Sequence, residues 1–246
     1  MNTVKTKSFE LALYIKGDKN ASRLAIVIPG RLDTKDYVAM TAAVDYLAEK
    51  GYYALSFDPP GTWESPGGIE LYTTTNTQKA IEELIELYGN RPTILIGHSR
   101  GGTHAMLAGT KNPAVTHYVA IMSHSGPSRV GMPEQGHKYI LSTRDTPPGI
   151  SRTTERIEFQ LPLAYFEDQE QYDAKPLLKT STKPKLFFYG TNDVLVSEKS
   201  VRETYTISAE PKMIQKIETE HDYRLHPEAI NQINLAIGNF LDEYKQ

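Results

Sequence analysis

The sequence predicts an α/β protein in which helices cover both faces of a mostly parallel sheet. Short apolar segments of strand length alternate along the chain with longer segments of helical periodicity. Most of the short segments are apolar at every position, as expected for strands buried on both faces. A serine in the pattern Gly-x-Ser-x-Gly also stands between one such strand and one such helix. Together these observations favour one domain with a reactive group at an edge of its sheet.

The strand-like segments can be followed in chain order. Residues 9–15 alternate in polarity and are expected to form an edge strand in an antiparallel hairpin. Residues 24–28 are continuously apolar and predict a fully buried strand. Strands of the same apolar character are expected at 53–57, 93–96, 118–122 and 185–189. A weaker strand, in which apolar and polar residues alternate, is expected at 213–217.

Between these strands lie segments of helical periodicity. Residues 80–88 place apolar side chains on one helical face, and residues 230–244 do the same near the C-terminus. Further helices are expected at 38–47, 99–108 and 197–205. This alternation of strands and helices predicts the layered α/β arrangement.

Residues 127–184 interrupt the alternation. The segment is rich in proline, has no clear apolar strand and is too long for a plain connection. We interpret it as an inserted cap of short helices and loops within a single domain that spans residues 1–246. Its aromatic side chains are expected mainly to pack the cap, with one or two facing a substrate. The arginines of the segment are either solvated at the surface or available to recognise a carboxylate of the substrate. They are Arg129, Arg144, Arg152 and Arg156.

The composition excludes several classes of function. The 246 residues are 39% apolar, and a net charge of −3 gives no general attraction to nucleic acid or to anionic membranes. Without cysteine the chain has neither a disulfide framework nor thiolate chemistry. Its polar start does not resemble a signal peptide, and no segment approaches the roughly 18 apolar residues that span a bilayer. We therefore predict a cytoplasmic protein without a membrane span; a homodimer is compatible with this sequence.

The pentapeptide Gly97-His98-Ser99-Arg100-Gly101 is the most informative motif. Glycines on both sides of the serine permit a sharp strand-to-helix turn that exposes the serine oxygen above the sheet. The motif is short enough to arise by chance, but the flanking strand and helix favour the functional interpretation. Because free serine is a poor nucleophile, a base, an acid and an oxyanion site must come from elsewhere in the chain.

Asp193 and His221 are the candidate partners of Ser99. Asp193 follows the strand at 185–189, and His221 follows the strand at 213–217. Loops that follow parallel strands emerge at the same edge of the sheet, so the three side chains are expected to gather there. His221 would take the proton of Ser99, and Asp193 would orient and stabilise the imidazole ring.

Each partner has an alternative interpretation. Asp193 could instead cap the helix that begins near Ser197 or fix a turn. His226 competes with His221, but its position before Pro227 favours a capping or surface role. The histidines near the expected site, His98 and His124, are assigned to packing and loop hydrogen bonds. The spacing of the remaining histidines is not typical of a metal site, and we predict neither a metal nor a cofactor.

An oxyanion site requires donors that are already in place. The backbone N–H of Arg100, directly after the candidate nucleophile, is the first expected donor. The second is expected from the loop after the strand at 24–28, where Gly30 permits a close turn, and we assign it to the backbone N–H of Arg31. The alternative for this loop is an ordinary turn.

Over nearly its whole length the chain resembles the α/β-hydrolase superfamily. The resemblance is carried by Pro29-Gly30, by Asp58-Pro59-Pro60-Gly61, by Gly97 to Gly102, and by Asp193 and His221 in the Ser-Asp-His order. It implies a three-layer sandwich with an eight-stranded, mostly parallel sheet, a cap inserted after the sixth strand, and hydrolysis through an acyl-enzyme without a cofactor. The chain departs from the pattern in having Pro29 where many relatives have histidine, no glycine before His221, and Arg100 directly after the serine.

The leading functional hypothesis is a serine hydrolase that cleaves a small to medium carboxylic ester. The same triad would also serve a thioesterase, an amidase or a C–C hydrolase, and the sequence does not separate these reactions. A third hypothesis is a ligand-binding or signalling protein of this fold with little turnover. Release of product from chromogenic esters distinguishes the enzymes from the binding protein.

Overall fold

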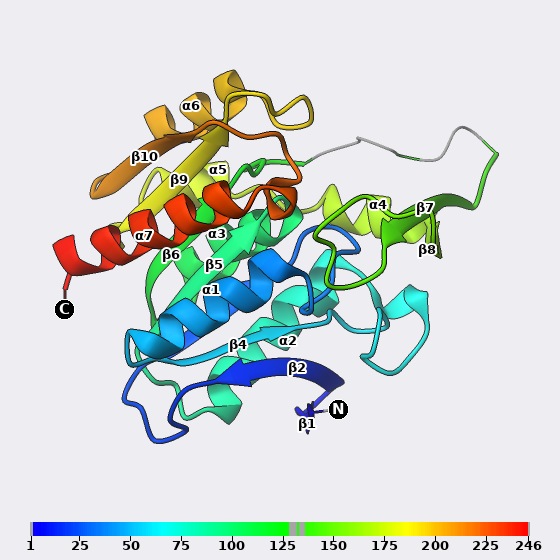
Figure 1. Cartoon of the computed structure of the whole chain (residues 1–246), viewed down its shortest axis with the longest axis horizontal. Helices are drawn as coiled ribbons and strands as arrows, with labels where there is room; N and C mark the ends of the chain where they lie inside the picture. The colour runs from blue at the N-terminus through cyan, green and yellow to red at the C-terminus, as the bar shows by residue number, and fades with distance from the viewer. Residues whose placement is uncertain (1, 128–131, 133–135, 246) are drawn as a thin grey trace.

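The computed structural model describes residues 2–127, 132 and 136–245, and its largest element is an eight-stranded sheet (Figure 1). The strand order is β1-β2-β4-β3-β5-β6-β9-β10. Six neighbouring strands run parallel to one another, in the order β4, β3, β5, β6, β9 and β10. At one edge, β2 pairs antiparallel with β4, and β1 pairs antiparallel with β2. The predicted α/β fold with a mostly parallel eight-stranded sheet is therefore confirmed.

The strands lie close to their predicted ranges. Their bounds are β1 Asn2–Lys5, β2 Glu10–Lys16, β3 Leu24–Ile28, β4 Tyr53–Phe57, β5 Thr93–His98, β6 Val115–Ile121, β9 Lys185–Gly190 and β10 Lys212–Ile217. All residues of β3, β5 and β9 are buried, which explains their nearly continuous apolar sequence. β1 could not be predicted, because its four residues lack an apolar pattern and none of them is fully buried.

Helices cover both faces of the sheet, as Figure 1 shows. The long helices are α1 Val38–Glu49, α2 Thr74–Leu87, α3 Arg100–Lys111, α6 Glu198–Ile207 and α7 Pro227–Glu243. Apolar side chains of α1 and α7 form one core with one face of the sheet, and those of α2, α3 and α6 form a second core with the other face. Among the described residues, no helix has both the length and the apolar character that crossing a membrane requires.

The segment between β6 and β9 contains a two-stranded antiparallel hairpin and two short helices. These elements are β7 Tyr139–Asp145, β8 Arg156–Pro162, α4 Leu163–Gln169 and α5 Lys175–Leu178. The expectation of helices and loops alone is therefore wrong. The hairpin gave no apolar signal because only Asp145 and Leu161 of its fourteen residues are buried. Figure 1 shows β7 and β8 lying apart from the eight-stranded sheet, next to α4.

A third, smaller core attaches this segment to the rest of the fold. Tyr165 and Phe166 of α4 and Leu161 of β8 are buried against Leu32 and Tyr72, which lie outside the insertion. The rings of Tyr72 and Tyr165 stack with their centroids 5.0 Å apart. These aromatic side chains therefore pack the insertion onto the domain, as expected for most of them.

The buried lysine at the start of β9 makes folding stability depend on pH. Lys185 has no exposed surface, and its Nζ donates to the backbone oxygens of Ser181 and Ala209, each at 2.7 Å. Burial lowers the pKa of Lys185 to about 8, although the nearby Glu210 opposes the shift. Because the folded chain binds this proton less tightly than the unfolded chain does, stability rises as the pH increases from about 8 towards 10.5.

We expect the free energy of unfolding of the native chain to rise between about pH 7.5 and about pH 9.5. This rise should exceed the corresponding change in Lys185→Met by roughly 1–2 kcal/mol. Urea unfolding at both pH values measures this difference. Lys199→Met is the matched control, since Lys199 is exposed on α6 and its loss should give no such difference. Equal pH dependence in the native and Lys185→Met chains would contradict the prediction.

Candidate active site

Ser99 occupies a sharp turn between β5 and α3. Its backbone has φ 52° and ψ −120°, a conformation that L-residues rarely adopt, and its N–H donates to the oxygen of Ile121 at 2.8 Å. The flanking glycines make this turn sterically feasible. A Cβ atom on Gly97 would lie 2.0 Å from the oxygen of Gly101, and one on Gly101 would lie 2.1 Å from the oxygen of Ile28. The turn thus has the geometry that the pentapeptide predicts.

Gly101→Ala is expected to destabilise the chain by roughly 3 kcal/mol, because the new methyl group would collide with backbone that cannot rotate away. Thermal and urea unfolding measure the loss. Gly126→Ala is the control, since a Cβ there would meet its nearest neighbour at 3.4 Å and is expected to be tolerated. A Gly101→Ala chain as stable as Gly126→Ala would show that the backbone around Ser99 adapts more easily than its packing implies.

His221 lies between Ser99 and Asp193. Its Nε2 is 2.9 Å from Ser99 Oγ, and its Nδ1 is 2.7 Å from Asp193 Oδ2. Asp193 follows β9, and His221 follows β10, so both come from the same edge of the sheet as the turn after β5. With Nδ1–H donating to the carboxylate, Nε2 can accept the hydroxyl proton of Ser99. The structure therefore brings together the three side chains that the sequence analysis selected.

The Asp193 carboxylate is held in its ionised form. Its side chain is fully buried, and Oδ1 accepts from the backbone N–H groups of Leu195 and Val196, each at 2.8 Å. Burial alone would raise the pKa of Asp193, but the hydrogen bond and charge of His221 and the two backbone donors outweigh it and lower that pKa. The carboxylate is thus able to orient the imidazole ring at neutral pH.

The competing histidine is not placed to contact Ser99. His226 is exposed, and its Nε2 lies 3.3 Å from a carboxylate oxygen of Glu220. It also stands at the N-cap of α7 without a side-chain capping bond, so only its surface assignment agrees with the structure. Asp193, in turn, does not cap α6, whose N-cap is Ser197 with its own side-chain hydrogen bond.

A second histidine supports the position of His221. His98 Nε2 lies 3.0 Å from the backbone oxygen of His221, and the two imidazole rings lie with their centroids 4.8 Å apart. Its other ring nitrogen is 3.6 Å from Asp33 Oδ2. The loop hydrogen bond expected of His98 is therefore present. Its partner Asp33 was not selected from the sequence, since nothing in the loop after β3 indicates which side chain turns inward.

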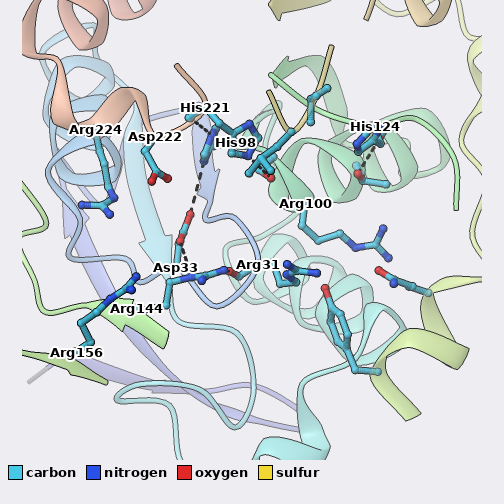
Figure 2. A pocket seen from close by; sticks show the side chains of 16 residues that line it. Arg31, Asp33, His98, Arg100, His124, Arg144, Arg156, His221, Asp222 and Arg224 are labelled. Atoms are coloured by element: carbon cyan, nitrogen blue, oxygen red, sulfur yellow. Dashed lines mark hydrogen bonds and ion pairs between the residues drawn. The ribbon is translucent and has the colours of Figure 1, made fainter. Parts of the chain in front are cut away.

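Ser99 and His221 open into a cavity of about 240 Å³ that also borders the insertion (Figure 2). The side chains around it are basic, although the chain has a net charge of −3, because five of them are arginines and two are aspartates. The lining residues are Arg31, Asp33, His98, Ser99, Arg100, Thr103, His124, Arg144, Arg156, Tyr165, Gln169, Leu195, Val196, His221, Asp222 and Arg224.

The two expected oxyanion donors, Arg31 and Arg100, both line this cavity together with Ser99. The loop after β3 turns at Gly30, whose oxygen accepts from the N–H of Asp33 at 3.1 Å. The N–H of Leu32 donates to the hydroxyl oxygen of Tyr72, and the oxygen of Arg31 accepts from Arg144 Nε at 3.0 Å. These bonds fix the peptide group that carries the Arg31 N–H and the peptide group that follows it.

One acidic cluster lies away from the cavity. Among the described residues, Asp36, Asp58 and Glu64 place carboxylate oxygens close enough together to suggest a cation site. The ammonium group of Lys35 already contacts all three, at 2.5, 3.4 and 2.6 Å respectively. The cluster is thus explained as an internal ion-pair network.

Comparison with known proteins gives matches of sequence and of structure. Residues 26–141 match the family described as alpha/beta hydrolase fold. Est1E from Butyrivibrio proteoclasticus, solved with ferulic acid, has a TM-score of 0.77 at 18% identity over 99% of this chain and 98% of its own. The esterase domain of a Rhodothermus marinus protein has a TM-score of 0.73 at 18% identity over 99% and 97%. The enol-lactonase from Burkholderia xenovorans has a TM-score of 0.72 at 17% identity over 98% and 100%. A search among curated proteins gave no match.

Proposed function

Since this chain has the α/β-hydrolase fold and its residues 26–141 match the family of that description, we propose that it is a serine hydrolase that cleaves a small to medium carboxylic ester through an acyl-enzyme. The single observation that supports this most strongly is the placement of His221, with one ring nitrogen 2.9 Å from the hydroxyl of Ser99 and the other 2.7 Å from Asp193. A nucleophile, a base and an orienting acid in this arrangement are the parts that acyl transfer needs.

In the proposed first step, Ser99 Oγ attacks the ester carbonyl carbon while its proton passes to His221 Nε2. The resulting tetrahedral intermediate carries its negative charge on the former carbonyl oxygen, which the backbone N–H groups of Arg31 and Arg100 would stabilise. The intermediate then collapses, the bond to the alcohol oxygen breaks, and His221 returns the proton to the departing alcohol. The products of this step are the free alcohol and an ester of Ser99.

In the second step a water molecule replaces the alcohol. His221 Nε2 takes a proton from the water as its oxygen attacks the acyl carbon, and a second tetrahedral intermediate forms. Its collapse breaks the bond to Ser99 Oγ, which recovers a proton from His221, and the carboxylic acid is released. Asp193 stays ionised throughout and stabilises the imidazolium that forms in both steps.

We assign the cap role to residues 127–184 because α4 and the β7–β8 hairpin contribute side chains to the cavity wall. Tyr165 and Gln169 come from α4, and Arg144 and Arg156 come from the hairpin. A wall built from the insertion lets its shape determine which acyl and alcohol groups fit beside Ser99. Arg129 lies outside the described residues and Arg152 does not line this cavity.

Release of 4-nitrophenol from esters of increasing acyl chain length tests the proposal. We expect the native chain to hydrolyse the shorter members. Prior treatment with a fluorophosphonate should reduce the rate of hydrolysis in proportion to the fraction of protein molecules that it modifies. A folded chain that neither reacts with the fluorophosphonate nor hydrolyses any member of the series would refute the proposed activity and favour a binding protein of this fold.

A further inference from the structure

The arginines around the cavity differ in what offsets their charge. Arg144 Nε lies 3.3 Å from Asp33 Oδ1, and Arg156 Nε lies 3.4 Å from Asp145 Oδ1. Arg224 Nη2 lies 2.5 Å from Asp145 Oδ2. The ion pairs of Arg144 and Arg224 therefore connect the hairpin with the edge of the sheet, and the ion pair of Arg156 lies within the hairpin.

Arg100 has no such partner. Its residue surface is only 8% exposed, and among the described residues no carboxylate lies within ion-pair distance of its guanidinium. Nη2 donates to Thr74 Oγ1 at 2.5 Å, and Nε is buried without a hydrogen-bond partner among the residues that the structure describes. A buried and unpaired charge is unfavourable, and native proteins normally offset it with an anion or with several hydrogen bonds.

The groups around Arg100 leave its charge uncompensated. Burial, together with the charge of Arg100, lowers the pKa of His104 well below its usual value, and burial is also the main cause that lowers the pKa of His124. Both imidazoles are therefore neutral at pH 7 and supply no negative charge. Tyr165 lines the same cavity and is 1% exposed, and its buried hydroxyl has no hydrogen-bond partner in the described ranges of the chain. Within the described part of the chain, a cation without an anionic partner and a hydroxyl group without a hydrogen-bond partner thus border one cavity.

The direction of the Arg100 side chain separates this part of the cavity from the ion pairs. Figure 2 shows it extending away from Asp33, Arg144 and Arg156, which lie together on the other side of the view. Arg100 directly follows Ser99 in the chain, and both residues line the same cavity. A ligand group bound there would belong to the same molecule as the bond being cleaved.

We propose that Arg100 binds a free carboxylate of the substrate, with the Tyr165 hydroxyl as a second donor, so that the ester cleaved at Ser99 is a monoester of a dicarboxylic acid. This inference rests on the proposed serine hydrolase function and specifies its substrate class. A carboxylate supplies the missing negative charge and accepts charge-assisted hydrogen bonds from a guanidinium. The acyl chain then reaches from the carbonyl carbon at Ser99 to the anion at Arg100.

Matched substrate pairs test the proposal. Each pair consists of a 4-nitrophenyl monoester of succinic, glutaric or adipic acid and the same compound with its free carboxylate converted to a methyl ester. We expect at least one charged member to exceed its neutral partner in kcat/KM by about tenfold or more in the native chain. The ratio within a pair cancels any effect on the triad or on the oxyanion donors.

Arg100→Met should reduce that ratio by about tenfold or more, mainly through a higher KM for the charged ester. Arg23→Met is the matched control, since Arg23 lies before the amino end of β3, at the opposite edge of the sheet, and its loss should leave the ratio unchanged. If Arg100→Met does not fold, Tyr165→Phe serves instead and should lower the ratio severalfold.

The outcomes separate this inference from the proposed function. Two results would overturn the carboxylate site and leave the hydrolase proposal intact. In the first, the native chain hydrolyses the neutral esters and does not prefer any of the charged esters. In the second, Arg100→Met keeps the native preference for the charged ester. If the native chain hydrolyses no ester, titration calorimetry of Ser99→Ala decides the inference on its own. Monomethyl glutarate must then bind at least about tenfold more tightly than dimethyl glutarate, and equal affinities would refute the site.

Discussion

Ser99→Ala is expected to lower kcat for ester hydrolysis by roughly four to six orders of magnitude. The substitution removes the hydroxyl oxygen that lies 2.9 Å from His221 Nε2 and leaves the oxyanion donors and the cavity in place. The residual rate would come from substrate binding and oxyanion stabilisation alone. Steady-state release of 4-nitrophenol measures the loss, and far-UV circular dichroism shows whether the variant is folded.

Ser200→Ala is the control for this substitution. Ser200 belongs to α6, and its Oγ lies 3.5 Å from a ring nitrogen of His124, so it is near the cavity but not in contact with His221. Its loss should change kcat by less than about tenfold. If Ser99→Ala retained more than about one-hundredth of the native kcat, another group would have to be the nucleophile.

Asp193→Asn is expected to lower kcat by about four orders of magnitude without unfolding the chain. The carboxylate holds the proton of His221 on Nδ1 at 2.7 Å, which keeps Nε2 free to accept a proton from Ser99. An amide that donates its own N–H to Nδ1 favours the opposite tautomer, in which Nε2 carries the proton and cannot act as a base. Stopped-flow measurement of ester cleavage at neutral pH quantifies the effect.

The matched control is Glu220→Gln. Glu220 neighbours His221 in sequence, but its carboxylate bonds to Arg152 and lies 3.3 Å from His226, and it is not part of the cavity wall. We expect a change in kcat of less than about tenfold. A similar loss in Glu220→Gln and Asp193→Asn would mean that general negative charge near His221 matters and that the specific hydrogen bond does not.

Most of the sheet could be predicted from the sequence because buried parallel strands are apolar at almost every position. Residues 24–28 and 185–189 were assigned within one residue of β3 and β9 for this reason. Where burial does not constrain the sequence, the prediction fails. β1 lies at the edge of the sheet, and only two of the fourteen residues of β7 and β8 are buried. None of these three strands therefore shows a pattern that distinguishes strand from loop.

The gathering of Ser99, Asp193 and His221 could be predicted because it follows from topology. All three residues come directly after parallel strands, whose carboxyl ends meet at one edge of the sheet. Their catalytic roles stay a prediction. The surroundings of His98 and Arg100 could not be predicted, because they depend on how the loop after β3, the start of α2 and the insertion fold over that edge.

The most direct test is to locate the acyl group during turnover. The native chain is mixed with a chromogenic ester that it hydrolyses, quenched in acid within milliseconds and digested for mass spectrometry. We predict an acyl adduct on the peptide that contains Ser99. The adduct should be absent from Ser99→Ala and strongly reduced in His221→Gln, which lacks the base that takes the Ser99 proton. Turnover with no adduct on any peptide, or an adduct on a residue other than Ser99, would contradict the proposed mechanism.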